Sequence, residues 1–197
     1  SAYGHEQLAG ARTTGDLEVQ WLGRPGPRAQ PDRQGRKPAP LSAGGRLFVQ
    51  GLHRVAALDI YNGSILWSLE IPALARFNIP RDSSNWCADD DHLYVAVDDR
   101  LWQIDAATGR VVRFHDVVAP ADESTYAWGY VARAGEQIFG SAVRRGAMFT
   151  KFWGREGWYD ATSGGETDKV TSDRFFAADR ATGATRWTYQ GGLIINP

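Results

Sequence analysis

The 197-residue sequence predicts an all-β fold built from a repeated unit of short antiparallel strands. Two observations lead to this prediction. The chain contains 22 glycines and 12% aromatic residues, a composition that favours strands and turns over helices. Landmark residues also recur at a fixed spacing of 46 residues, and recurrence on that scale marks a repeat architecture.

Three copies of the repeat are visible. The landmarks of the first two copies are Leu47, Asp59 and Gly63, followed by Leu93, Asp105 and Gly109. In the third copy Ile138 keeps the spacing, whereas Asp179 and Gly183 each lie 74 residues after their counterparts. The third copy therefore contains an insertion of roughly 29 residues, near residues 144–173.

Every copy has the same order of elements. A polar turn leads into two apolar runs, a turn containing Asn-Gly or Thr-Gly follows, and a third run closes the copy. A short segment before each polar turn supplies a fourth strand. Four antiparallel strands in about 40 to 50 residues are typical of a propeller blade. Consecutive apolar residues, as at residues 93–97, indicate sheets covered on both faces by neighbouring blades. The predicted fold is a partial β-propeller of three four-stranded antiparallel blades, plus flanking strands of neighbouring blades.

This organisation divides the chain into five segments. Residues 1–40 hold the last strand of a preceding blade and a basic Pro/Gly-rich loop, 41–71 form blade 1, 72–118 form blade 2 with the loop that leads into it, 119–190 form blade 3 with its insertion, and 191–197 begin a following blade. The chain is therefore expected to be a fragment. Alone, its bare sheet faces and strand edges are expected to cause association or poor solubility.

The turn between the third and fourth strands explains why aspartate, glycine and tryptophan recur in the repeat. A short aspartate side chain bonds nearby backbone N–H groups, and the glycine supplies a positive φ without steric cost. A tryptophan four residues after the glycine is placed to fill the space between blades. The residues assigned to this structural repeat are Asp59, Gly63, Trp67, Asp105, Gly109, Asp179, Gly183 and Trp187.

Two copies carry a more specific pattern. The stretches Ala57-x-Asp59-x-x-x-Gly63-x-x-x-Trp67 and Ala177-x-Asp179-x-x-Thr182-Gly183-x-x-x-Trp187 resemble the tryptophan-docking repeat of the PQQ-like (quinoprotein alcohol dehydrogenase-like) β-propellers, over about residues 41–197. The middle copy departs, with Gln103 for alanine and Arg113 for tryptophan, which predicts a looser blade interface. Because propellers of this family usually close with about seven or eight blades, the resemblance implies about three blades of a larger bacterial protein, in the periplasm or otherwise outside the cytoplasm.

The long connections all emerge at one end of the predicted blades, and function concentrates on such loops. They are rich in arginine and aromatic residues, which suit carboxylate, sulfate, phosphate or sugar ligands, or a protein partner. An equally good interpretation is a set of solvated loops with a small aromatic core holding the insertion in place. The candidate ligand-binding residues are Arg24, Arg28, Arg33, Arg81, Trp86, Trp128, Arg144, Arg145, Trp153 and Trp158.

No catalytic residue, metal ligand or cofactor site is evident. The resemblance to quinoprotein dehydrogenases implies PQQ stacked on a tryptophan, a Ca²⁺ ion, an aspartate base and a vicinal cysteine pair. The chain has one cysteine, Cys87, and nothing in the spacing of its aspartates and asparagines selects a Ca²⁺ site. Trp86 and Trp128 could floor such a cofactor, although packing is the commoner fate of tryptophans on innermost strands.

Two functions follow. The favoured one is a noncatalytic scaffold, or a ligand- or protein-binding module, whose partners are the remaining blades of the parent chain. The alternative is part of a PQQ- and Ca²⁺-dependent dehydrogenase whose catalytic residues lie mostly outside this chain. The net charge of -1 gives no basis for nucleic-acid binding, and the lack of an 18-residue apolar run predicts no membrane span.

Overall fold

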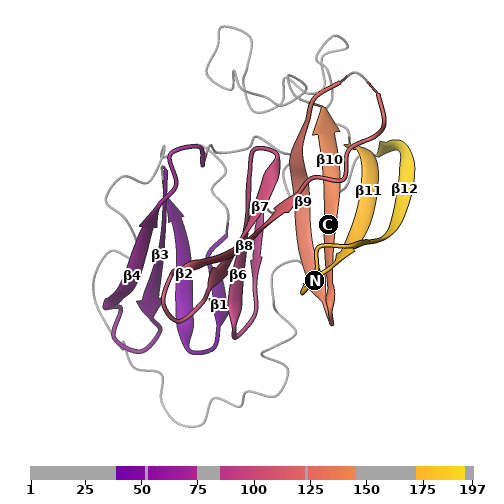
Figure 1. The fold of residues 1–197 in the computed structure, drawn as a ribbon. Helices are drawn as coiled ribbons and strands as arrows, with labels where there is room; N and C mark the ends of the chain where they lie inside the picture. The colour runs from indigo at the N-terminus through magenta and orange to yellow at the C-terminus, as the bar shows by residue number, and fades with distance from the viewer. Residues whose placement is uncertain (1–38, 52, 75–84, 123, 145–171, 194–197) are drawn as a thin grey trace, which may run out of the picture.

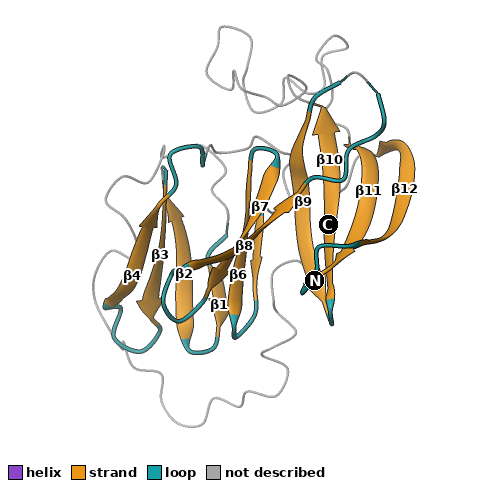
Figure 2. Ribbon diagram, in the orientation of Figure 1, coloured by secondary structure: helices purple, strands orange, loops and turns teal. Residues whose placement is uncertain are grey.

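The computed structural model describes residues 39–51, 53–74, 85–122, 124–144 and 172–193. The described residues form strands and turns, with no helix among them, as Figure 2 shows. The strands make three separate four-stranded antiparallel sheets. The described part of the chain contains no helical segment with the length and hydrophobicity that crossing a bilayer requires.

Each sheet is a meander in which neighbouring strands are consecutive in the sequence. Blade 1 consists of β1 (Leu41–Ala43), β2 (Arg46–Gly51), β3 (Arg54–Asp59) and β4 (Ile65–Glu70). Blade 2 consists of β5 (Trp86–Ala88), β6 (His92–Val97), β7 (Arg100–Asp105) and β8 (Val111–Asp116). Blade 3 consists of β9 (Tyr126–Ala134), β10 (Gln137–Arg144), β11 (Ser172–Asp179) and β12 (Thr185–Leu193). The three sheets stand side by side and do not close into a ring (Figure 1), so the predicted partial β-propeller is confirmed.

The turns between the third and fourth strands of the blades share one geometry. Asp105 Oδ1 accepts hydrogen bonds from the backbone N of Thr108 at 2.8 Å and of Ala107 at 3.1 Å. Gly109 closes the turn with φ 74°, in the left-handed region that glycine enters without a Cβ clash. The corresponding glycines of blades 1 and 3 have φ 70° and 77°. The same local chemistry therefore builds the same turn three times.

The core lies between the blades. Strand β6 shows how: Leu93, Val95 and Val97 pack into the cluster shared with blade 1, and Tyr94 and Ala96 pack into the cluster shared with blade 3. All five residues are at most 4% exposed. Because successive side chains of a strand point to opposite faces, an uninterrupted apolar run fits only a sheet that is covered on both sides.

One tryptophan fastens blade 1 to blade 2. The Trp67 indole Nε1 donates a hydrogen bond to the Ala106 carbonyl across the junction, at 2.9 Å. Its ring lies directly over Gly109, where an added Cβ would come within 2.7 Å of two ring atoms. Trp67 is 9% exposed. The contact couples the outer strand of one blade to the repeat turn of the next.

Candidate functional site

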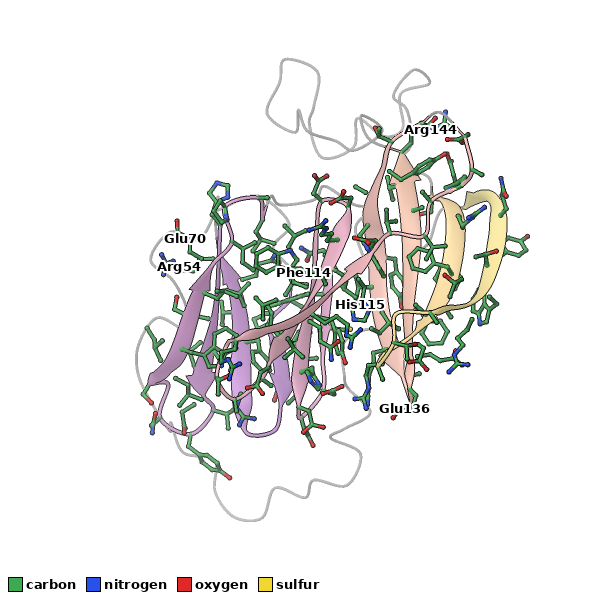
Figure 3. All side chains as sticks on the ribbon, in the orientation of Figure 1. Arg54, Glu70, Phe114, His115, Glu136 and Arg144 are labelled. Atoms are coloured by element: carbon green, nitrogen blue, oxygen red, sulfur yellow. The ribbon has the colours of Figure 1, made fainter. Side chains whose placement is uncertain are left out.

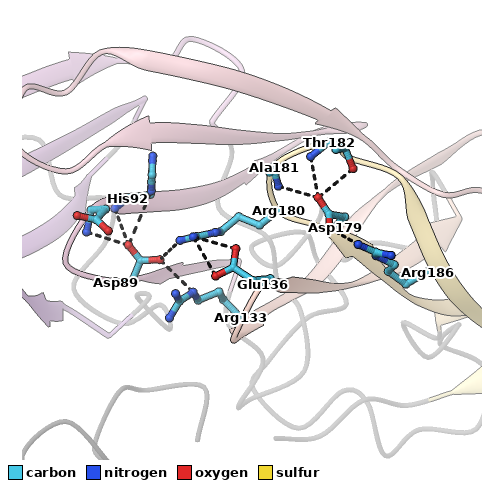
Figure 4. A network of polar contacts seen from close by, with 10 residues as sticks. Asp89, His92, Arg133, Glu136, Asp179, Arg180, Ala181, Thr182 and Arg186 are labelled. Atoms are coloured by element: carbon cyan, nitrogen blue, oxygen red, sulfur yellow. Dashed lines mark hydrogen bonds and ion pairs between the residues drawn. The ribbon is translucent and has the colours of Figure 1, made fainter.

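A buried polar network joins blade 2 to blade 3 (Figure 4). Its centre is Asp89, in the turn between β5 and β6, with a side chain 7% exposed. Asp89 Oδ1 accepts from the backbone N of Asp91 and of His92, at 2.9 and 2.7 Å. Asp89 Oδ2 lies 3.0 Å from Arg133 Nε and 3.6 Å from Arg180 Nη1, and both arginines belong to blade 3. A carboxylate from one blade is thus neutralised by two guanidinium groups from the next.

The same aspartate belongs to a group of possible metal ligands. Asp89, Asp91 and His92 can bring one ligand atom each within 4.8 Å of one another. Ca²⁺ needs six to eight oxygen ligands, and this group offers two carboxylates and an imidazole. The two guanidinium groups on Asp89 would also repel a cation there. The cluster therefore does not fit the Ca²⁺ ion of a quinoprotein site, and its geometry is that of a blade junction.

The two tryptophans considered as a possible support for PQQ lie inside the packing between blades. Trp86 and Trp128 are both 0% exposed. The Trp86 indole Nε1 donates to the Ala39 carbonyl at 3.2 Å. Trp128 meets Phe176 edge-to-face, with ring centroids 4.9 Å apart, and closes over Gly140. Neither indole offers an open face on which PQQ could stack, so these two residues do not fit that cofactor.

The described end of the insertion carries a second polar cluster. Arg144, the last residue of β10, donates from Nε and Nη2 to Asp173 Oδ2 at 3.2 and 2.9 Å. The Tyr126 hydroxyl lies 2.8 Å from Asp122 Oδ2 and 3.0 Å from Asp173 Oδ2. The hydrogen bond from Tyr126 lowers the pKa of Asp122, and hydrogen bonds with Tyr126 and Asp173 raise that of Arg144. The Arg144 side chain remains 56% exposed, and Figure 3 shows it at one extremity of the molecule.

Among the candidate ligand-binding residues, the structure thus places Trp86 and Trp128 in the core and Arg144 on the surface. The remaining candidates lie outside the described residues: Arg24, Arg28, Arg33, Arg81, Arg145, Trp153 and Trp158. The sequence offered no signal for Asp89, Arg133 and Arg180, because they contact only after blades 2 and 3 have come together. The departures from the repeat pattern at Gln103 and Arg113 did point to the junction between blades 2 and 3.

At this junction a histidine lies where blade 1 uses its tryptophan. Arg113 pairs with Gln103 across β7 and β8, as Trp67 pairs with Ala57 in blade 1. His115, two residues further and 4% exposed, faces Gly183 of blade 3, and its Nε2 lies 3.0 Å from Gln103 Oε1. Its Nδ1 is buried without a hydrogen-bond partner among the described residues. Burial lowers the pKa of His115, as does Arg113, and Asp116 opposes them.

Several proteins of known structure have a similar fold. Quinohemoprotein alcohol dehydrogenase from Comamonas testosteroni has a TM-score of 0.51 at 19% identity, and the match covers 79% of this chain and 21% of that one. A europium-containing methanol dehydrogenase has a TM-score of 0.51 at 18% identity, covering 80% and 32%. Apo AztD from Citrobacter koseri has a TM-score of 0.50 at 14% identity, covering 86% and 39%. At these identities the likeness shows the fold alone, and the chain spans between 21% and 39% of the length of these three proteins.

The family assignment rests on sequence. No curated protein matches the chain significantly. Residues 21–147 match a family model of PQQ-like repeats that is described as outer membrane protein assembly factor BamB. The match covers more than half of the chain and contains blades 1 and 2 entirely. The chain, with its three propeller blades and repeated Asp-x-x-x-Gly turns, belongs to this PQQ-like repeat family.

Proposed function

We propose that the chain is a noncatalytic scaffold segment of a larger protein, with a ligand- or protein-binding face at the end of the blades where Arg144 lies. The proposal rests chiefly on the ion pairs that Asp89 forms with Arg133 and Arg180. The acidic cluster with ligand-like chemistry is used to join two blades, which is a structural role. The remaining partners are further blades of the parent chain and an anionic, sugar or protein ligand. Family membership and its printed description support a location outside the cytoplasm.

A cofactor titration tests the noncatalytic part of this proposal. The protein is titrated with PQQ in the presence of Ca²⁺, and alcohol oxidation is followed with an artificial electron-accepting dye. We expect no saturable change in the PQQ absorbance spectrum and no dye reduction above the rate without protein. Stoichiometric binding together with alcohol-dependent dye reduction would instead establish the dehydrogenase alternative.

A matched pair of arginine variants tests the binding face. Arg144 and Arg100 are similar in exposure, at 56% and 55%, and each contacts an aspartate, Asp173 or Asp116. With inorganic sulfate and a sulfated disaccharide as probes, Arg144→Ala should weaken binding about tenfold, the loss expected for one charge-assisted hydrogen bond. Arg100→Ala should leave both affinities unchanged. Equal affinities for the wild-type protein and Arg144→Ala would remove Arg144 from the site.

A further inference from the structure

The turn that joins β3 to β4 contains an asparagine directly before a glycine. Asn62 precedes Gly63, whereas the other three asparagines of the chain precede isoleucine, tryptophan or proline. Because glycine has no side chain to shield its backbone N, an asparagine before it is especially prone to spontaneous deamidation. Asn62 is exposed, and its turn lies at the lower end of blade 1 in Figure 1, opposite to the end where Arg144 lies.

Deamidation at this pair consumes only water. The deprotonated backbone N of Gly63 attacks Cγ of Asn62, and a bond forms between these atoms while the bond from Cγ to Nδ2 breaks. Nδ2 leaves as ammonia and takes up, through solvent, the proton that the Gly63 N has lost. Water then opens the resulting succinimide ring at either of its two carbonyls. The product is aspartate or isoaspartate at position 62, and no electron acceptor is required.

In the folded turn both reacting groups are engaged in hydrogen bonds. The Gly63 backbone N donates to the Asp59 carbonyl at 2.9 Å. Asn62 Oδ1 accepts from the Ser64 backbone N at 2.8 Å, and the Asn62 backbone N donates to Asp59 Oδ1 at 3.1 Å. A hydrogen-bonded amide keeps its proton until the bond opens, as in hydrogen exchange. The attack on Cγ therefore requires the turn to open first.

The corresponding residue of blades 2 and 3 is a threonine, which cannot undergo this reaction. Thr108 and Thr182 each donate from Oγ1 to the aspartate that begins the turn, Asp105 or Asp179, at 2.7 and 2.9 Å. A carboxylate at position 62 has no proton to donate, and its charge would repel that of Asp59. Isoaspartate in addition lengthens the backbone by one atom ahead of β4. Both products therefore disturb a turn that the other two blades keep intact.

We propose that Asn62 is a deamidation site gated by opening of the blade 1 turn, and that its products loosen the junction between blades 1 and 2. The link between turn and junction is β4, which begins at Ile65 and carries Trp67. Trp67 donates to the Ala106 carbonyl of blade 2, so a turn of changed length or charge displaces the strand that positions the indole. The proposal is independent of the proposed function, because the reaction needs neither the binding face nor a further blade.

Timed incubation in mildly alkaline buffer tests the gate. Deamidation adds a negative charge, so anion-exchange chromatography separates the modified protein, and peptide mass spectrometry locates the site. In guanidinium chloride we expect Asn62 to react ahead of Asn78, Asn85 and Asn196. In the folded protein its rate should be at least about tenfold lower, because the reaction then requires local opening. Equal rates in the two conditions would show that the turn does not gate the reaction, and an unreactive Asn62 in guanidinium chloride would show that it is not a site.

A matched pair of aspartate variants assigns the gate to this turn. Asp59→Ala removes the carboxylate that accepts from the backbone N of Tyr61 and of Asn62, so it should raise the rate in the folded protein at least about tenfold. Asp105→Ala removes the same contacts from the blade 2 turn and should leave the rate nearly unchanged. Equal acceleration by both variants would assign the reaction to global unfolding and overturn the gate. If Asp59→Ala does not fold, the comparison of folded and denatured wild-type protein still decides.

The separated forms test the link to the junction. The isoaspartate form should have a lower Tm than the unmodified protein, and Asn62→Asp should lie between them because it carries the charge without the extra backbone atom. Asn62→Thr should abolish the reaction and keep the Tm. The tryptophan fluorescence of the isoaspartate form should shift to the red, and Trp67→Phe should remove that shift. Identical Tm and fluorescence for the modified and unmodified proteins would overturn the effect on the junction.

Discussion

At the scale of single residues, aspartates perform two different tasks in this chain. Asp59, Asp105 and Asp179 stabilise the repeat turns by accepting hydrogen bonds from backbone N–H groups two and three residues later. Hydrogen bonds from Arg186 and Thr182 hold the pKa of Asp179 well below its usual range. Asp89 also accepts a hydrogen bond within its own turn, and in addition it forms ion pairs with Arg133 and Arg180 of blade 3. The first task is local and the second depends on the arrangement of blades.

The substitution Asp89→Asn tests the junction between blades 2 and 3. The amide keeps an acceptor for the turn, but it leaves Arg133, whose side chain is 27% exposed, without the counter-charge of Asp89. Arg180, 21% exposed, then keeps only Glu136 as its acidic partner among the described residues. We expect the free energy of unfolding to fall by about 3 kcal/mol, because removing one partner of a buried ion pair strands the other. Urea denaturation measures the loss.

The control for Asp89→Asn is Asp116→Asn. Asp116 pairs with Arg100, and its side chain is 83% exposed. An exposed ion pair contributes less than about 1 kcal/mol, so this variant should unfold nearly like the wild type. Equal losses for Asp89→Asn and Asp116→Asn would contradict the assignment of Asp89 as the centre of the junction.

His115 makes the stability of the same junction depend on pH. Burial of the imidazole, followed by the charge of Arg113, lowers the pKa of His115 in the folded protein below its value in the unfolded chain. Below the unfolded pKa of about 6.5 the unfolded state binds more protons at His115, and its contribution to stability declines until the folded pKa is passed. Above that range the contribution is constant.

The variant His115→Gln isolates this effect, because glutamine can still hydrogen-bond with Gln103 and does not titrate. The free energy of unfolding should decrease less between pH 7.5 and pH 5 in the variant than in the wild type. Urea melts at several pH values measure the two slopes. Parallel pH profiles would show that His115 titrates alike in the folded and unfolded states.

At the scale of elements, the uninterrupted apolar strand β6 was predictable from the sequence. The contact between the turn of one blade and the outer strand of the next was only partly predictable. The run at residues 93–97 indicated a sheet buried on both faces, and the structure distributes its side chains over two cores. The spacing of Trp67 from Gly63 predicted a tryptophan between blades. It could not identify Ala106 and Gly109 as the contacted residues, because they are remote in sequence and belong to the neighbouring sheet.

A pair of glycines separates backbone strain from the collision with the indole. Gly109 and Gly45 both have φ 74°, but an added Cβ meets Trp67 at 2.7 Å in the first and nothing within 4 Å in the second. Gly45→Ala should therefore cost about 1 kcal/mol of stability, the strain of a left-handed alanine. Gly109→Ala should lower the stability by a further ~1 to 3 kcal/mol, because the overpacked contact with Trp67 must shift.

The comparison between these variants is made by urea denaturation under the same conditions. A red shift and increased quenching of tryptophan fluorescence should accompany Gly109→Ala alone, because displacement of Trp67 exposes its ring. Indistinguishable losses of stability for the two alanine variants would mean that the junction accommodates the extra carbon, and that the Trp67 contact is loose.

At the scale of the whole molecule, the single cysteine reports on the opening of the arc. Cys87 is 6% exposed, in the cluster between blades 2 and 3, and burial, followed by the charge of Asp89, raises its pKa. A thiol reagent should not react in native buffer, and the labelled fraction should follow the global unfolding curve in urea. Asp89→Asn should accelerate the reaction. Rapid labelling of the wild-type protein without urea would show that blades 2 and 3 separate locally.

The sequence by itself determined the elements of this protein: the four-stranded unit, the turns that need aspartate and glycine, and the tryptophans placed to lie between blades. These features depend on residues close together in the chain, so their pattern can be read without coordinates. Only the tertiary structure decided which residues meet across blades, namely Asp89 with Arg133 and Arg180, His115 with Gly183, and Trp128 within a closed core. Such contacts depend on the relative position of separate sheets, which no local spacing encodes.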